Sequence, residues 1–290
     1  MNSVPLRLVA LGAVEAETLV ALGIAPVSRP GSDSSPWYRS AVRSIVTSEE
    51  LQNYDDAKSL SSSLFSDIKP DAFISVGPRL GKAEYESLSK LAPVLLAPEN
   101  VSPQSWEDIA SFVASAVGMT KPMESLVADA KTAIAEIVED YPDLQGASTL
   151  MVSASSVSGS DYVLSGTHSS PMAFLKGIGM KEAPAVATLA AKLTAANARF
   201  PYDSLYLPRT QSGRLSADVL IVSVPAVDYT SYKANEKLGE GFPAFGDGTL
   251  YVTNAAEALS LQRQSILGAQ WCARNVLPEL AKSVYLNRQK

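Results

Sequence analysis

Arginines and large aromatic residues are the side chains of this sequence best suited to binding a ligand, and they stand in loops between predicted elements. One loop spans residues 29–39 and ends in Trp37, Tyr38 and Arg39. Arg79 follows a predicted buried strand, and ligands of open α/β sheets bind at the carboxyl ends of strands. Arginine is a planar cation with several donors, and aromatic rings cover flat ligand faces. The loop is either a hydrophobic anchor or a ligand surface, and Arg79 is either a ligand contact or a solvated surface arginine.

The second half of the chain carries candidates of the same kind, selected by composition alone. They are Tyr202, Arg209, Tyr229 and Tyr232, all in predicted connecting loops. His168 is the only histidine and lies in a Gly-Thr-His-Ser-Ser turn. It is either a hydrogen-bonded turn residue or a contact to haem or iron. Protein sites for free zinc or manganese recruit several histidines, so we expect no metal held by protein ligands alone.

The motifs of common enzyme classes do not occur in the sequence. There is no G-x-S-x-G elbow, Walker A loop, G-x-G-x-x-G fingerprint or H-E-x-x-H pair. His168 could in principle serve a Ser-His-Asp hydrolase, but no nucleophile motif accompanies it. Cys272 is the single cysteine, which excludes an internal disulfide, and its helical context beside Trp271 predicts a buried structural thiol. We therefore expect a binding protein without a cofactor rather than an enzyme.

Composition and charge limit the class of protein. The chain has 290 residues, of which 46% are hydrophobic and 19% charged, as in a globular protein large enough for two domains. The net charge is −6 without a long basic run, so nucleic acid is not an expected partner. No apolar stretch is long enough to predict a transmembrane helix. The apolar run near Met1 is too short for a signal peptide, so the protein is either cytoplasmic or a mature form whose export signal has been removed.

Residues 122–141 predict a long amphipathic helix near the middle of the chain. The stripe of apolar residues at helical spacing is Leu126, Val127, Ala130, Ile134, Ile137 and Val138. On either side, short strands and helices alternate as in parallel α/β layers. We therefore predict an α/β protein with two lobes joined by one long rigid helix: residues 1–120 form one lobe, 121–143 the linking helix and 144–290 the other lobe. The alternative is an ordinary packing helix within one domain.

Individual elements can also be predicted within the two lobes. The predicted helices include residues 13–22, 106–117, 256–270 and 275–286, and the predicted strands include 72–76, 149–154, 217–223 and 250–253. Residues 188–197 are rich in alanine and ambiguous.

Six segments carry a family pattern in the same order along nearly the whole chain. They are LVALGAVEAETLVALGIAPVS, IKPDAFIS, LSKLAPVLLAP, WEDIASFVASAVG, ADVLIVS and VLPELAKSV. The chain thereby resembles the class III periplasmic substrate-binding proteins of ABC importers, in their iron–siderophore branch. The resemblance implies a ligand cleft between the lobes, extracytoplasmic binding of a ferric siderophore and its delivery to an ABC permease in the membrane. We also expect a monomer, whose precursor is a membrane-anchored lipoprotein.

The resemblance carries site roles over best to Arg79 and Trp37, which would contact the iron chelate. The family also carries one glutamate on each lobe that pairs with permease arginines, and the matching positions here are Ser63 and Thr210. Because neither is acidic, docking through those two salt bridges is not expected; the substitutes to consider are Glu49, Glu50 and Glu99. The alternatives are a haem or cobalamin binding protein of the same fold, or a ligand scavenger or sensor that has lost permease docking.

Overall fold

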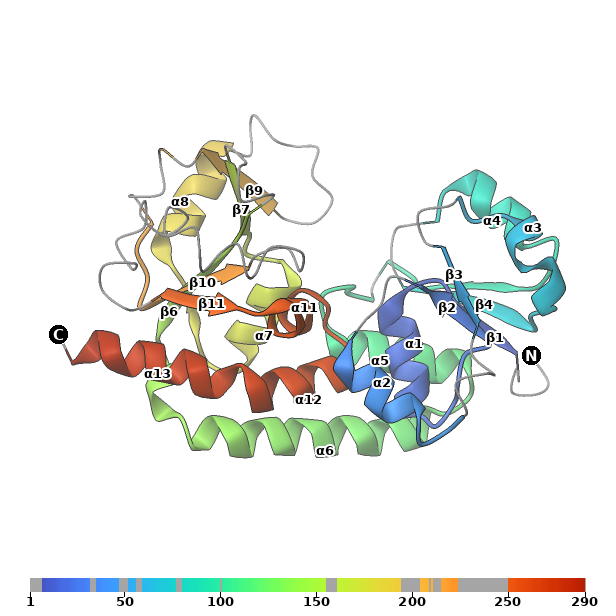
Figure 1. Ribbon diagram of the computed structural model, residues 1–290, viewed down its shortest axis with the longest axis horizontal. Coiled ribbons are helices and arrows are strands. Elements are labelled where there is room, and N and C mark those ends of the chain that lie inside the picture. Colours follow the sequence, from blue (N-terminus) through green and yellow to red (C-terminus); the bar gives the residue numbers. More distant parts are fainter. Residues whose placement is uncertain are drawn as a thin grey trace. The chain divides into compact units, whose positions relative to one another are not determined.

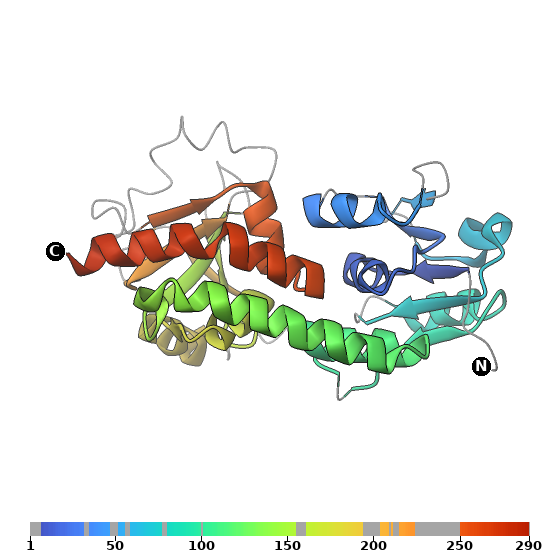
Figure 2. The ribbon, with the colours of Figure 1, turned by 90° about the horizontal axis from the view of Figure 1, so that it is seen from below.

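The computed structural model describes residues 7–31, 35–46, 52–55, 59–76, 80–99, 101–154, 161–193, 204–208, 210, 215–223 and 250–289. The chain divides into two compact units. Unit 1 contains Met1–Lys131 with Gln264–Ala269, and unit 2 contains Thr132–Arg263 with Gln270–Lys290. The chain passes from unit 1 to unit 2 within α6 (Thr120–Glu139), an uninterrupted helix of 20 residues (Figures 1 and 2). The predicted long helix is therefore present.

Unit 1 is built on a parallel sheet of five strands in the order β3-β2-β1-β4-β5. The strands are β1 (Leu8–Ala10), β2 (Ser28–Pro30), β3 (Gln52–Tyr54), β4 (Ala72–Ser75) and β5 (Val94–Leu96). The helices are α1 (Ala13–Ala21), α2 (Pro36–Val42), α3 (Ser62–Phe65), α4 (Lys82–Leu88) and α5 (Trp106–Ala116), with a 3₁₀ helix η2 (Ser66–Ile68). Strands alternate with helices along the chain, which is the parallel α/β pattern that the sequence predicts.

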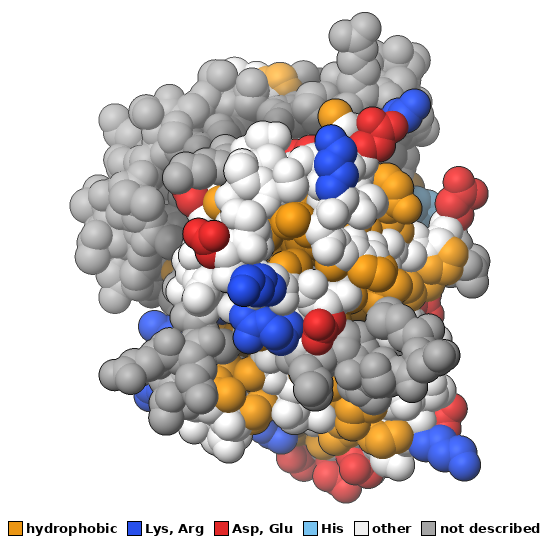
Figure 3. Space-filling model, turned by 90° about the vertical axis from the view of Figure 1, so that its right-hand side faces the viewer, with side chains coloured by type: hydrophobic (Ala, Val, Ile, Leu, Met, Phe, Trp, Pro, Cys, Tyr) orange, Lys and Arg blue, Asp and Glu red, His pale blue; other side chains and the backbone are white. Residues whose placement is uncertain are grey.

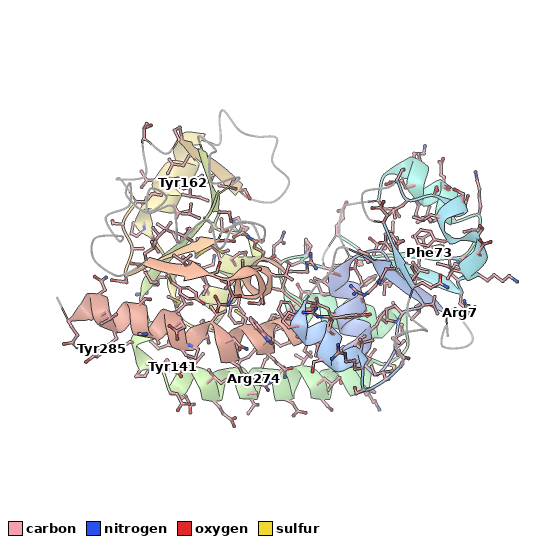
Figure 4. All side chains as sticks on the ribbon, in the orientation of Figure 1. Arg7, Phe73, Tyr141, Tyr162, Arg274 and Tyr285 are labelled. Carbon is pink, nitrogen blue, oxygen red and sulfur yellow. The ribbon has the colours of Figure 1, made fainter. Side chains whose placement is uncertain are left out.

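Aromatic residues fill the core of unit 1 between the sheet and α3. Phe65 is fully buried, and its ring centroid lies 5.2 Å from that of Tyr54 and 5.3 Å from that of Phe73, both edge to face. Figure 4 shows Phe73 inside the unit. The hydroxyl of Tyr54 donates a 3.0 Å hydrogen bond to the carbonyl of Leu11, so its buried polar end is satisfied. These contacts fix β3 and β4 against one helix layer.

Unit 2 contains a mixed sheet in the order β11-β10-β6-β7-β9, and β8 pairs with β6. The strands are β6 (Ser148–Ala154), β7 (Asp161–Ser165), β8 (Lys181–Glu182), β9 (Ser204–Pro208), β10 (Val219–Ser223) and β11 (Leu250–Thr253). The helices are α7 (Ser170–Gly177), α8 (Pro184–Leu193), α11 (Ala255–Gln262) and α13 (Leu277–Arg288), with a 3₁₀ helix η3 (Pro142–Leu144). α12 (Ile266–Asn275) begins in unit 1 and continues in unit 2 from Gln270. β7 pairs antiparallel with β6 and β9, whereas β10 pairs parallel with β6 and β11. The buried Tyr162 of β7 lies in the core (Figure 4).

One aspartate joins neighbouring strands at their starts in each unit. Asp71 precedes β4 and accepts a 2.9 Å hydrogen bond from the backbone N–H of Arg7, which precedes β1. Asp218 precedes β10 and accepts bonds of 2.6 and 2.8 Å from the backbone N–H and the hydroxyl of Ser148, at the start of β6. The carboxylates satisfy polar groups where the parallel ladders begin. The aspartates of the KPD and ADV segments therefore have a structural role in strand pairing.

Two predictions about local structure were wrong. Residues 29–39 were predicted to be a loop, but their first residues belong to β2 and α2 begins at Pro36. The helix forms here because proline fits the first helical position and because Tyr38 and Val42 share a buried face. Residues 256–270 were predicted to form one helix, but α11 ends at Gln262 and α12 starts at Ile266. The hydroxyl of Ser265 accepts a 3.0 Å hydrogen bond from the N–H of Gly268 and so caps a new helix.

Candidate ligand-binding site

Buried acidic side chains gather beside the carboxyl ends of β1 and β4 in unit 1. Glu15 and Glu17 follow β1 on α1 and are 2% and 0% exposed. Glu15 accepts a 2.6 Å hydrogen bond from the N–H of Val76, directly after β4. Gly12 makes this possible, because a β-carbon there would collide with the Glu15 carboxylate. Two carboxylates thus lie at the edge of the sheet where parallel α/β proteins bind ligands. The sequence analysis missed these residues; the signal that could have identified them is the acidic EAE run directly after a strand.

Glu17 connects three elements of unit 1. One carboxylate oxygen accepts a 3.1 Å hydrogen bond from the hydroxyl of Ser35, at the start of α2. The other accepts a hydrogen bond from the hydroxyl of Ser265, at the start of α12. A buried carboxylate needs such donors because its charge loses water on folding. Glu17 therefore fixes the start of α2 relative to α1 and to residues 264–269.

The aromatic residues predicted for the site lie on the buried side of α2. Trp37 is 5% exposed and Tyr38 is 1% exposed. The guanidinium of Arg29 lies 4.1 Å from the centroid of the Tyr38 ring, within the range of a cation–π contact. Of the two alternatives for this segment, burial gives Trp37 and Tyr38 the anchor role. Direct contact of either ring with a ligand stays a prediction.

The exposed side of α2 carries Arg39 and, one turn later, Arg43. Both line a hollow of about 370 Å³ together with Pro36 and Ser40. This volume is within the range of small-molecule sites, about 300–1,000 Å³. Arg39 was predicted from the sequence, whereas Arg43 was missed because residues 29–39 were predicted to be a loop. Only the helix puts the two side chains on one face.

A polar group at the carboxyl edge of the unit 2 sheet was also missed by the sequence analysis. The side-chain amide of Gln262, at the end of α11, donates to the hydroxyls of Ser223 and Ser153, at 3.1 and 3.4 Å. These serines lie in β10 and β6, which pair in register at Ser223 and Ser153. The signal in the sequence is the serine near the end of each apolar strand. The arrangement presents hydroxyls and an amide, which can donate to or accept from a neutral polar ligand.

His168 is exposed in the turn between β7 and α7. The turn is held by its neighbours, because the hydroxyl of Thr167 donates to Glu182 at 3.0 Å and Lys176 donates to the carbonyl of Thr167 at 2.7 Å. The backbone of the turn is therefore fixed while the imidazole reaches the surface. A role of His168 in ligand binding stays a prediction.

The other predicted site residues lie outside the part of the chain that the structure describes. They are Arg79, Tyr202, Arg209, Tyr229 and Tyr232, and the possible docking residues Glu49 and Glu50 lie outside it as well. Ser63 on α3 and Thr210 are described and exposed, as is Glu99. On the face drawn in Figure 3, basic, acidic and hydrophobic side chains are intermixed.

Cys272 is a free thiol, and it is fully buried. Burial raises the pKa of this thiol from 9.0 to about 12, so the nucleophilic thiolate is not formed at neutral pH. The predicted burial of this thiol is confirmed. Across the described residues, no group of three or more His, Cys, Asp or Glu side chains could hold a metal ion. None of the described helices is long and apolar enough to cross a membrane.

Residues 8–196 match the model of a family described as periplasmic binding protein. The fold is similar to that of PiaA from Streptococcus pneumoniae, an iron uptake ABC transporter substrate-binding protein, in complex with ferrichrome. The sequence identity is 18%, the match covers 99% of this chain and 95% of that chain, and the TM-score is 0.79. FhuD2 from Staphylococcus aureus with bound ferrioxamine B has 13% identity, coverage of 96% and 99%, and a TM-score of 0.70.

A periplasmic solute binding protein from Mycobacterium smegmatis is similar as well, with 19% identity, coverage of 97% of this chain and 93% of that chain, and a TM-score of 0.76. A search of the curated proteins gives no match. The structural likeness at these identities concerns the fold alone. The family model covers well over half of the chain, and on that ground the chain belongs to the periplasmic binding protein family.

Proposed function

We propose that this protein binds a ferric siderophore outside the cytoplasm and delivers it to an ABC-type importer. The observation that carries the proposal is the family match over residues 8–196, in a fold shared with PiaA bound to ferrichrome and FhuD2 bound to ferrioxamine B. The proposal assigns the chain no catalysis and no resident cofactor. It describes a monomer that binds a small iron chelate, contacts a permease and does not bind nucleic acid.

Within each unit, the ligand contacts of this proposal lie at the carboxyl edge of the sheet. In unit 1, α2 is anchored by Trp37 and Tyr38 and presents Arg39 at the surface. In unit 2, the hydroxyls of Ser153 and Ser223 lie at the ends of two parallel strands. Cations and hydroxyls are the donors that the oxygen-rich surface of a ferric chelate requires. The domain limits predicted above, with residues 121–143 as the linking helix, belong to the same proposal.

Binding of a panel of ligands tests this function. The panel consists of ferrichrome, ferrioxamine B, ferric citrate, haem and cobalamin, each titrated into the protein while tryptophan fluorescence is followed. We expect at least one ferric chelate to quench the emission at micromolar concentration or below, because iron complexes absorb and quench nearby indoles. Preference for haem or cobalamin over every ferric chelate would move the assignment to a haem or cobalamin binding protein. Failure of all five would refute the proposed transport function.

A second function, scavenging or sensing without transport, is favoured by one observation. The two positions that match the family's docking glutamates, Ser63 and Thr210, carry exposed hydroxyls and no charge. Such a protein would bind a ferric chelate but would not contact an ABC permease. Reconstituted uptake into vesicles, measured with radioactive iron and the permease, separates the two functions.

A further inference from the structure

We propose that Arg39 and Arg43 form an anion-binding subsite on α2, which takes a carboxylate of the ligand. The inference rests on the proposed function, because it names the chemical class of the chelate: an iron complex that carries carboxylate groups free to accept hydrogen bonds. The structure of unit 1 alone leads to it.

The helix α2 is held in place from its buried side. Trp37 and Tyr38 are buried, and Arg29 covers the ring of Tyr38 at 4.1 Å. The hydroxyl of Ser35 at the start of the helix donates to the buried carboxylate of Glu17 at 3.1 Å. A helix anchored at its start and along one side presents its exposed residues in a fixed arrangement. Less conformational entropy is then lost when a ligand binds to them.

The exposed side of α2 is positively charged. Arg39 and Arg43 are four residues apart, so the two guanidinium groups lie on the same helical face. Within the described part of the chain, neither guanidinium makes an ion pair or a hydrogen bond. Some other exposed cations of the described residues do have acidic partners; for example, Arg288 lies 2.8 Å from Asp143. Two like charges one turn apart repel each other, and a bound anion would relieve this repulsion.

A hollow lies beside the two arginines. It has a volume of about 370 Å³ and is lined by Pro36, Arg39, Ser40 and Arg43. Among the lining residues that the structure describes, the polar side chains are two cations and a hydroxyl, without a carboxylate. Guanidinium groups bind carboxylates through two parallel hydrogen bonds, and Ser40 can donate a further one. The lining therefore fits a carboxylate-rich ligand, whereas a neutral hydroxamate complex has no charge to offer to these two cations.

The test compares two iron complexes and two double variants. Ferric citrate is the carboxylate-rich probe, ferrichrome is the neutral probe, and affinities are measured by isothermal titration calorimetry. Arg39→Gln/Arg43→Gln removes the two charges from α2. Lys90→Gln/Lys121→Gln is the matched control, because it removes two exposed positive charges from the same unit that are not part of α2. All four side chains are exposed, so the variants should fold, and far-UV circular dichroism checks this.

We expect wild type to bind ferric citrate more tightly than ferrichrome. The arginine double variant should bind ferric citrate at least about tenfold more weakly, and the lysine control should stay within about twofold of wild type. Arg39→Lys/Arg43→Lys should give an intermediate loss, because lysine keeps the charge but not the two-pronged donor geometry. The affinity of wild type for ferric citrate should also fall with added salt more steeply than that of the arginine variant.

Other outcomes separate the subsite from the proposed function. If wild type binds ferrichrome tightly and ferric citrate weakly, the subsite proposal is overturned while siderophore binding stands. An equal loss of ferric citrate affinity in both double variants would also overturn it, because long-range charge would then explain the effect. If iron-free citrate binds as well as ferric citrate and only the arginine variant loses this binding, the subsite is supported and the siderophore function is refuted.

Discussion

The carboxylate of Glu17 and the hydroxyl of Ser265 are joined by a buried hydrogen bond between residues 248 positions apart in the sequence. Glu17 belongs to the first helix of the chain and Ser265 to the start of α12. Both side chains are completely buried. The bond holds Ser265 against α1, and residues 264–269 belong to unit 1 although the residues on both sides of them belong to unit 2.

Replacement of Ser265 by alanine should destabilise the protein. The variant takes one donor away from a buried carboxylate and removes the hydroxyl that caps α12. We expect the free energy of unfolding to fall by about 1–3 kcal/mol, measured by urea denaturation. Ser44→Ala is the control, because its exposed hydroxyl donates only to the carbonyl of Ala41, and its effect should stay within about 0.5 kcal/mol. Equal stability of Ser265→Ala and wild type would contradict a stabilising role of this bond.

The two aspartates that join strand starts should differ in their contribution to stability. Asp218 is half-buried, accepts two hydrogen bonds from Ser148 and donates through its own N–H to the Ser148 hydroxyl at 2.9 Å, whereas Asp71 is exposed and accepts a bond from the N–H of Arg7. Asp218→Ala should lower the free energy of unfolding by about 1–3 kcal/mol. The loss in Asp71→Ala should be smaller, because water can replace its bond. Thermal or urea unfolding of both variants checks the order, and the reverse order would show that burial of the carboxylate does not decide the effect.

The thiol of Cys272 should make stability depend on pH in the alkaline range. Its folded-state pKa is raised by burial from 9.0 to about 12, so between these values the unfolded thiol loses its proton and the folded thiol keeps it. The unfolded state then binds fewer protons, and the stability of the folded state falls as the pH rises above about 9. Between pH 9 and pH 10 the loss should exceed that of Cys272→Ala by about 1 kcal/mol. Parallel pH profiles for the two proteins would contradict the shift.

Restoring acidic residues at the positions of the family's docking glutamates should strengthen binding to a permease that presents arginines. Ser63 and Thr210 are both exposed, so glutamate can replace either without disturbing a core. Each new surface pair should contribute about 0.2–1 kcal/mol. Binding of Ser63→Glu/Thr210→Glu to the permease in nanodiscs measures this, with Ser44→Glu as the control for added charge. If the double variant binds no better than Ser44→Glu, the docking surface lies elsewhere.

Protein purified without siderophore should contain little metal. The described residues include no cluster of His, Cys, Asp or Glu able to hold an ion, and a chelate rather than the protein would supply the iron ligands. Elemental analysis of dialysed protein should give iron, zinc and manganese well below one equivalent. One tightly held equivalent of any of these metals would point to direct protein coordination.

Local patterns were enough to predict the scaffold. The apolar stripe before Tyr141 indicated a long helix, and α6 occupies 120–139. This prediction succeeded because the hydrophobic period and the prolines are local signals, each spanning only a few residues. The strand at residues 250–253 was predicted correctly for the same reason, and the strand at 217–223 was predicted two residues too long at its start. The strands β3, β8 and β9 were missed; β3 and β8 have only three and two residues, too few to show a period.

The candidate site depended on partners that the sequence keeps far apart. The sequence identified Arg39 as a ligand residue together with Trp37 and Tyr38, but packing of α2 buries the two aromatics and leaves Arg39 beside Arg43. Local sequence cannot decide this, because the direction of each side chain follows from which face of α2 meets the rest of unit 1. The pairing of Glu17 with Ser265 was hidden for a related reason. A carboxylate can be buried only where hydrogen-bond donors surround it. One donor to Glu17 is Ser265, 248 positions later in the sequence, and it comes near Glu17 only when the whole of unit 1 has assembled.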